Sequence, residues 1–407
     1  MSSRPSLPEI FLVALRLGCT SFGGPVAHLA YFRKEYVEKR RWLDDTHYAD
    51  LVALGQFLPG PASSQVGFGV GCVQRGLAGG LAAWLGFTLP SAVLMIAFGY
   101  GVATLGDLST AGWLKGLKAA AVAVVAQAVW QMWRSLCPDL PRSLLAGVSA
   151  GVLILAPQAW SQVAVIVAGA AIGFTWLRPT AGGGAISPAR QGPRNHHPAG
   201  LMAPPPAAAS GLGFLLLFLI LLIGLPALVR ITNNPWLETA DKFYRTGALV
   251  FGGGHVVLPL LEREVVAPGG VTPDQFLAGY GAAQAVPGPL FTFAAYLGTI
   301  MTRGPHGVAG GLWALGAIFL PALLVMAGAM PYWERLRQRE EAQAALRGAN
   351  AAVVGLLLAA LYHPVGTSGL TDLRSTALAV AAFALLQWAR LPAWAVVLLA
   401  AAAGAVS

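Results

Sequence analysis

The sequence predicts an all-α, polytopic membrane protein made of two homologous halves with broken helices, and three observations support this fold class. Hydrophobic residues make up 56% of the 407 positions and charged residues only 11%, with a mean hydropathy of +0.64. A soluble protein carries roughly a quarter charged residues, so most of this surface must face something other than water. Runs such as 212–225 and 393–403 contain no charge and approach the ~20 apolar residues that cross a bilayer. The third observation is an internal duplication.

About thirteen apolar segments are separated by charged or Pro- and Gly-rich breaks. The first half is predicted to contain six of them, near 8–28, 48–73, 77–104, 113–136, 143–160 and 161–177. The second half is predicted to contain seven, near 211–230, 243–261, 275–299, 308–330, 344–362, 376–389 and 393–407. Residues 178–210 are rich in Gly, Pro, Ala and Arg, which is typical of a flexible linker. We therefore expect one repeat over 1–177 and a second, with an extra leading helix, over 211–407.

The duplication keeps both order and register. The stretch 18–24 matches 247–253, and each ends in Phe-Gly-Gly. The stretch 56–61 matches 284–289, and each has the form Gln-x-x-Pro-Gly-Pro. These and later matches, such as Pro90 with Pro321, keep an offset between 228 and 232 residues. Chance similarity between apolar segments would not preserve this order, so the halves are homologous.

The charges in the loops indicate how the two halves are oriented. The loop after Phe-Gly-Gly in the first half contains Arg33, Lys34, Lys39, Arg40 and Arg41, whereas its counterpart contains only Arg263. Because Lys and Arg are retained on the cytoplasmic side, this asymmetry favours inverted repeats. The basic loop 335–339 argues for the other arrangement, although neighbouring Glu residues dilute its charge.

The same retention of basic loops explains most of the net charge of +9, so we expect the lipid bilayer and not a nucleic acid as the partner. The apolar run near the N-terminus carries Arg16 and no small-residue cleavage site follows it, which indicates a first membrane helix. Cys19, Cys72 and Cys137 are widely spaced, without a CxxC pair or a neighbouring His. We expect no metal site and no cofactor.

Each Pro-Gly-Pro element should break its helix, because Pro lacks a backbone donor and Gly adds freedom. A helix restarted at Pro presents unpaired N–H groups and a partial positive charge, which together attract an anion. A packing kink is the alternative, but matched breaks in two halves favour the central site of a transporter. The candidate ligands at these elements are Gln56, Gly60, Ser63, Ser64, Gln284, Gly288 and Thr292.

The Phe-Gly-Gly elements are second candidate breaks. Consecutive glycines let a backbone approach a ligand closely, although small residues also pack membrane helices together. The duplication is what gives the motif weight. The candidate ligands here are Ser21, Gly23, Gly24, Gly252 and Gly253.

Arg16 and Arg245 each precede Phe-Gly-Gly by six residues in an apolar run. A charge at the middle of a membrane helix costs about 2.5–3.5 kcal/mol, so it usually faces a cavity or a partner. A guanidinium can make two parallel hydrogen bonds to a tetrahedral oxyanion. Snorkelling at a helix end is an equal alternative for Arg245 and for Lys115, which matches Arg347. Arg16 is therefore the favoured cationic ligand.

Four titratable residues are candidates for proton coupling. Glu35 and Glu264 occupy equivalent positions, where a salt bridge to a nearby Arg is the favoured alternative. His28 and His255 have a suitable intrinsic pKa but are not equivalent. A lone His near an interface is usually only hydrogen-bonded.

Several long motifs resemble the two-domain form of the chromate ion transporter (CHR) family. They include Ser-Phe-Gly-Gly-Pro-Val-Ala-His at 21–28, Gln-Phe-Leu-Pro-Gly-Pro-Ala-Ser-Ser-Gln at 56–65, Phe-Gly-Gly-Gly-His-Val-Val-Leu-Pro at 251–259 and Gly-Tyr-Gly-Ala-Ala-Gln-Ala-Val-Pro-Gly-Pro at 279–289. The resemblance covers nearly the whole chain except the linker. It departs at Ala30, where the family pattern has Gly. It implies a protein of the bacterial plasma membrane that exports chromate, confers chromate resistance and has its halves in opposite orientations.

Other functions remain open at this point. Sulfate and molybdate share the shape and charge of chromate, so no motif separates these substrates. A membrane-embedded reductase would need a redox cofactor motif, which the sequence lacks, and a structural subunit would not need duplicated breaks. No Walker-type motif is present, so a secondary transporter is expected and not an enzyme. A homodimer is compatible with all of this.

Overall fold

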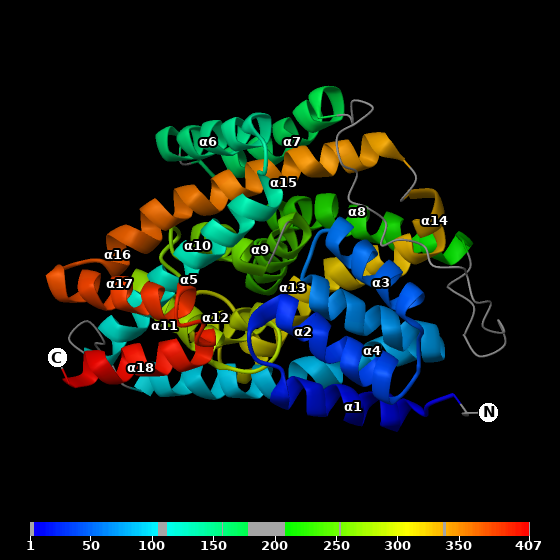
Figure 1. The fold of residues 1–407 in the computed structure, drawn as a ribbon, viewed down its shortest axis with the longest axis horizontal. Helices are drawn as coiled ribbons and strands as arrows, with labels where there is room; N and C mark the ends of the chain where they lie inside the picture. The colour runs from blue at the N-terminus through cyan, green and yellow to red at the C-terminus, as the bar shows by residue number, and fades with distance from the viewer. Residues whose placement is uncertain are drawn as a thin grey trace.

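The computed structural model describes residues 4–104, 112–156, 158–177, 208–251, 254–336 and 339–406. Over these ranges the chain is helical and contains no β-strand (Figure 1). Residues 178–207, which cover most of the predicted linker, lie outside this description. The helices before them are α1 (Leu7–Thr20), α2 (Gly24–Phe32) with its π-helical continuation η1 (Arg33–Lys39), α3 (Asp45–Phe57), α4 (Ala62–Thr104), α5 (Gly112–Leu136), α6 (Leu140–Leu155) and α7 (Ala159–Trp176).

After the residues that the structure does not describe, the chain continues with α8 (Ala208–Thr232). The later elements are α9 (Pro235–Leu249), η2 (Gly254–Val256), α10 (Val257–Val265), α11 (Pro273–Ala285), η3 (Leu290–Thr292), α12 (Phe293–Ile300) and α13 (Gly307–Ala329). They are followed by η4 (Met330–Tyr332), α14 (Trp333–Leu336), α15 (Glu340–Ala360), η5 (Leu361–Gly366), α16 (Thr367–Gly369), α17 (Leu373–Gln387) and α18 (Ala393–Val406).

Five helices are long and apolar enough to cross a membrane: Ala62–Thr104, Gly112–Leu136, Ser210–Thr232, Gly307–Tyr332 and Glu340–Gly369. Five shorter apolar helices accompany them: Leu140–Leu155, Trp160–Trp176, Leu290–Ile300, Leu373–Gln387 and Ala393–Val406. Together with the low charge, these helices make the chain an all-α integral membrane protein.

Equivalent helices begin with equivalent caps. The Asp44 side chain accepts the His47 N–H at the start of α3, and Thr272 forms a capping box with Gln275 at the start of α11. In the same way Asp139 caps α6 and Asp372 caps α17. Each cap satisfies an N–H group that the first turn leaves without a partner, which typically stabilises a helix by ~1 kcal/mol. The capping residues therefore fix the same helix starts in both halves.

The long helix α4 consists of two helices that fold back on each other. Non-helical backbone at Arg75 (φ −140°) and Gly76 (φ 61°) separates them. The reversal brings Gly71 and Gly79 so close that a Cβ on Gly71 would lie 2.2 Å from the Gly79 carbonyl oxygen. The predicted boundary between 48–73 and 77–104 is confirmed at this bend. In the second half, α12 and α13 form the matching pair, with Gly298 against Gly310.

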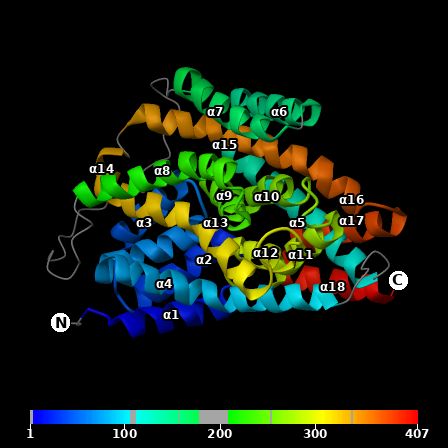
Figure 2. The ribbon, with the colours of Figure 1, turned by 180° about the vertical axis from the view of Figure 1, so that it is seen from behind.

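One long helix of each half packs against the outer helices of the other half. α15 packs along α6 and α7 at one edge of the molecule, and α5 packs along α17 and α18 at the opposite edge (Figures 1 and 2). Glycine allows both contacts. A Cβ on Gly116 would lie 2.0 Å from the Ala400 carbonyl oxygen, and one on its counterpart Gly348 would lie 2.0 Å from that of Gly169. Membrane helices associate closely where small residues let their backbones approach.

We expect Gly116→Ala and Gly348→Ala each to lower the thermal stability of the purified protein. The added Cβ has no room in either contact, and forcing extra atoms into a packed interior costs about 1–3 kcal/mol. Gly147→Ala in α6 is the matched control, because nothing lies within 4 Å of a Cβ built at that position. Thermal unfolding of the three variants in one detergent measures this. Unfolding midpoints that are the same for all three variants would contradict the role of these contacts.

Candidate functional site

The helices are interrupted at all four predicted elements. α3 ends at Phe57 and α4 begins at Ala62, on either side of the first Pro-Gly-Pro, and α11 and η3 flank the second. Gly60 has φ +120° and Gly288 has φ +102°, a region that favours glycine. The first Phe-Gly-Gly lies at the junction of α1 and α2, with Gly24 as the first residue of α2, and the second lies between α9 and η2. Gly252 and Gly253 fall outside the described residues.

Reciprocal hydrogen bonds join the interruptions of the two halves. The Gly60 N–H donates to the Val250 carbonyl oxygen at 2.7 Å, and the Gly288 N–H donates to that of Ser21 at 2.9 Å. Ser21 and Val250 are equivalent positions at the ends of α1 and α9. Each Pro-Gly-Pro break is therefore bonded to the Phe-Gly-Gly break of the other half.

Each Pro-Gly-Pro glycine also packs against the proline-containing helix of the other half. A Cβ on Gly60 would lie 2.6 Å from Cβ of Ala322 in α13, and one on Gly288 would lie 2.7 Å from Oγ of Ser91 in α4. Pro25 and Leu290 both lie within 3.9 Å of a Cβ built on Gly254. All four interruptions thus meet in one region between the halves.

Buried polar side chains surround this region on the side of the first half. His28 Nδ1 lies 3.3 Å from Ser63 Oγ, and the His28 ring packs edge-on against Phe87. Ser91 Oγ donates to the Thr88 carbonyl oxygen at 3.1 Å. The hydroxyls of Ser21, Ser64 and Thr88 have no hydrogen-bond partner among the described residues. Leaving such a group unpaired in the interior costs about 1–3 kcal/mol, so these hydroxyls are suited to a ligand.

Three polar residues near the breaks were not predicted from the sequence. Gln65 Nε2 donates to the carbonyl oxygens of Pro59 (2.9 Å) and Ala322 (3.2 Å), which ties the first break to α13. Thr88 and Ser91 lie in an apolar stretch of α4, one on each side of the Leu89-Pro90 pair. The feature of the sequence that could have identified Thr88 and Ser91 is that both hydroxyl residues lie close to Pro90 within an apolar stretch. By contrast, the predicted Gln56 is exposed on α3.

The second half has a different polar group near its breaks. His255 Nδ1 lies 2.8 Å from the Tyr280 hydroxyl, which also contacts the Gln284 side chain. The Thr292 hydroxyl donates to the Pro289 carbonyl oxygen at 2.8 Å, so it is satisfied within its own turn. Tyr280 lies on α11 outside the duplicated motif and was not predicted.

The predicted cations lie within ion pairs or at the surface. Arg245 Nη2 is 2.7 Å from Asp241 Oδ2 and 3.5 Å from Glu264 Oε2, beside a cavity of about 30 Å³. Arg16 is exposed on α1 and lines a surface hollow of about 480 Å³ together with Glu9 and Arg40. The structure therefore does not bring Arg16 to the breaks.

Both candidate glutamates form the salt bridges that were the favoured alternative. Glu35 lies 2.9 Å from Arg40 and 3.2 Å from Lys39, and Glu264 approaches Arg245 as described. Lys115 lies 3.9 Å from the capping residue Asp372, and its counterpart Arg347 donates to the Leu177 carbonyl oxygen at 3.1 Å. The contacts of Glu264, Lys115 and Arg347 join different elements, whereas those of Glu35 lie within η1 and at its C-terminal end. Within the ranges that the structure covers, no three His, Cys, Asp or Glu side chains are grouped to hold a metal.

Comparison with known proteins finds the same duplication. The family model described as "Chromate transporter" matches residues 8–174 and again 237–405. The chain is 29% identical over 360 residues to the chromate transport protein of Pseudomonas aeruginosa. This alignment covers 86% of this chain and 79% of the relative. It is 27% identical over 390 residues to the chromate transport protein of Cupriavidus metallidurans. That alignment covers 94% of this chain and 88% of the relative. No solved structure matches the chain.

The family model covers both halves and leaves out the stretch between them, which contains the whole of α8. The similarity to the two relatives spans most of the length of each protein. Both relatives are transport proteins and not enzymes. The interrupted helices that meet at the centre of this molecule are therefore those of a member of the chromate transporter family.

Proposed function

We propose that the chain exports chromate from the cytoplasm across the bacterial inner membrane as a secondary transporter. The observation that carries this proposal is the meeting of four helix interruptions, joined by the Gly60–Val250 and Gly288–Ser21 hydrogen bonds. Interrupted helices present N–H groups and buried hydroxyls that can replace the hydration shell of an anion. The names of the relatives supply the substrate.

The architecture that we propose has thirteen membrane segments in two inverted repeats. Nine of the segments are continuous helices: the second part of α4, α5, α6, α7, α8, α13, α15, α17 and α18. The other four are pairs of short helices joined at a break: α1 with α2, α9 with α10, α3 with the first part of α4, and α11 with α12. The reciprocal contacts fit a two-fold relation between repeats 1–177 and 211–407, and the loop charges favour an axis in the membrane plane.

Alternating access would arise when the repeats move relative to each other around the breaks. The polar atoms there are buried from solvent in this conformation, so an anion can enter only after such a movement. The membrane potential favours export, because moving each negative charge out of an inside-negative cell gains about 2.3 kcal/mol per 100 mV. Export of chromate in this way would confer resistance.

Flux through purified protein in liposomes tests the proposal. We expect labelled chromate to leave loaded vesicles faster when an inside-negative potential is imposed, and protein-free vesicles to show only leakage. Chromium should remain hexavalent throughout, whereas its reduction would indicate an enzyme. Sulfate and molybdate serve as competitors. Flux of either ion without any flux of chromate would contradict the proposed substrate.

A further inference from the structure

The buried polar side chains around the breaks belong mainly to the first half. Six of them, each no more than 2% exposed, form what we call the hydroxyl cluster: Ser21, His28, Ser63, Ser64, Thr88 and Ser91. His28 contacts Ser63, and Ser91 bonds to the backbone of Thr88. Gly288 of the other half lies between Ser21, whose carbonyl it bonds, and Ser91, which it touches. The cluster is therefore contiguous with the meeting point of the four breaks.

The equivalent positions of the second half are almost entirely apolar. With the offsets of the duplication, the counterparts of the hydroxyl cluster are Val250, Val257, Phe291, Thr292, Phe319 and Ala322. Each of them is buried to the same degree as the cluster. The rings of Phe291 and Phe319 lie 5.6 Å apart, where the first half has Ser63 and Thr88. Thr292 is the single polar residue among them, and its hydroxyl is satisfied by Pro289.

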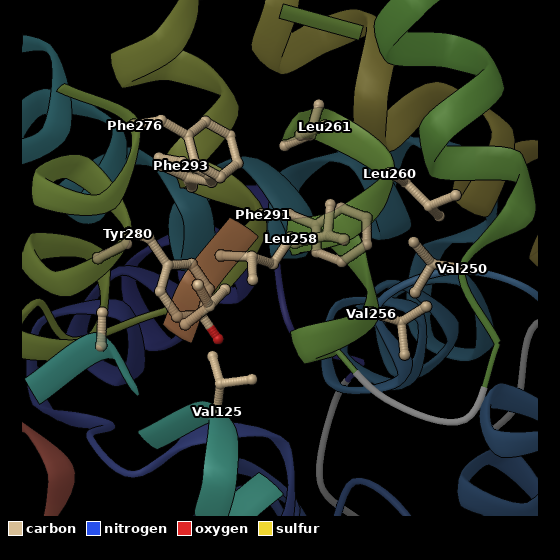
Figure 3. Packing of buried hydrophobic residues seen from close by; sticks show 14 of the residues in the cluster. Val125, Val250, Val256, Leu258, Leu260, Leu261, Phe276, Tyr280, Phe291 and Phe293 are labelled. Atoms are coloured by element: carbon tan, nitrogen blue, oxygen red, sulfur yellow. The ribbon is translucent and has the colours of Figure 1, made fainter. Parts of the chain in front are cut away.

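Figure 3 shows how apolar side chains pack in this part of the interior. The region around the second set of breaks is filled by one cluster of buried apolar side chains, among them Val250, Phe291 and Phe293. The apolar members of this cluster offer an anion no hydrogen-bond donor, and desolvating an unpaired charge among them is prohibitive. The Tyr280 hydroxyl in the same cluster contacts His255 and the Gln284 side chain, and Gln284 Nε2 has no partner among the described residues. In the hydroxyl cluster, by contrast, the hydroxyls of Ser21, Ser64 and Thr88 are donors without a partner among the described residues.

Ser64 also lies in the first turn of α4, where the N–H groups have no acceptor within the helix. Hydroxyl donors and a helix N-terminus together stabilise an anion without a neighbouring ammonium or guanidinium group. None of the six side chains in the cluster is an Arg or a Lys, and His28 is its one titratable group.

We propose that the transporter holds a single tetrahedral oxyanion, bound by the hydroxyl cluster at the N-terminus of α4. The equivalent region of the second half is a packing block that binds no anion. The site is thus one-sided: the side chains that bind the anion come from the first half alone, although the fold is duplicated. One anion moves in each transport cycle. This inference rests on the proposed transport function and specifies where its substrate is held.

Equilibrium binding to the purified full chain tests the site, with chromate, sulfate and molybdate as separate probes. We expect one anion per chain, and we expect Ser64→Ala and Thr88→Val each to weaken binding about tenfold or more, because each removes a donor to the ligand. Thr299→Val is the matched control. The Thr299 hydroxyl is buried in α12 and donates to its own helix at the Ala295 carbonyl oxygen, so its removal should leave binding unchanged.

Two anions per chain, or equal weakening by Thr88→Val and Thr299→Val, would overturn the one-sided site. Wild-type affinity in both Ser64→Ala and Thr88→Val would also overturn it, even if the protein carries chromate. The proposed function fails separately. A chain that binds sulfate or molybdate through Ser64 and Thr88, but neither binds nor carries chromate, would retain the site and lose the proposed substrate.

Discussion

Gly60→Ala and Gly288→Ala are each expected to reduce chromate flux about tenfold or more, equivalent to ~1.4 kcal/mol, while the protein remains in the membrane. Both glycines have a positive φ that a residue with a Cβ adopts only with strain. In addition, a Cβ added at Gly60 would lie 2.6 Å from that of Ala322. The backbone must then move, which lengthens the hydrogen bond from the N–H at this position to Val250.

Gly269→Ala separates backbone strain from this packing effect. Gly269 has φ +77° in the turn between α10 and α11, and nothing lies within 4 Å of a Cβ built there. The substitution therefore introduces comparable strain away from the breaks, and its flux should stay near wild type. Adding Ala322→Gly to Gly60→Ala removes the clashing atom and should restore part of the flux. An equal loss in the Gly269 variant, or no response to Ala322→Gly, would show that packing at the breaks is not the cause.

The positions of the interruptions could be predicted because they depend on local chemistry. Pro lacks an N–H and Gly tolerates φ above zero, so the elements at 59–61 and 287–289 end their helices wherever they occur. The caps Asp44 and Thr272 are also local features. How the breaks pair across the two halves could not be predicted, because the Gly60–Val250 bond joins residues that are far apart in the sequence.

The candidate site was harder to predict, because the duplication directed attention to residues that the halves share. Thr88 and Ser91 align with Phe319 and Ala322 in the second half, so a comparison of the repeats does not identify them as candidates. The position of Arg16 inside an apolar run predicts that it faces a cavity or a partner. However, α1 buries Ile10, Val13, Ala14 and Leu17 on its other side, which leaves Arg16 on the exposed face. An apolar run alone does not show which face of a helix points inward.

The ion pair between Lys118 and Asp274 should have the largest effect on stability. Lys118 Nζ lies 2.8 Å from Asp274 Oδ1 and joins α5 of the first half to α11 of the second. The Lys118 side chain is only 9% exposed, whereas that of Asp274 is 35% exposed. Removing the carboxylate leaves a nearly buried ammonium group without its partner, and breaking a buried pair on one side costs on the order of 3 kcal/mol.

We therefore expect Asp274→Asn to lower the unfolding midpoint clearly, and the double variant Lys118→Met with Asp274→Asn to recover most of that loss. Methionine retains the length of the lysine stem and carries no charge, so the desolvation cost disappears together with the ion pair. Thermal unfolding of the two variants beside wild type in one detergent makes the comparison. A double variant that is less stable than Asp274→Asn would mean that the Lys118 charge stabilises the fold through another partner. A stable single variant would mean that water reaches the ammonium group past the partly exposed carboxylate, and the contact between α5 and α11 would then depend on apolar packing alone.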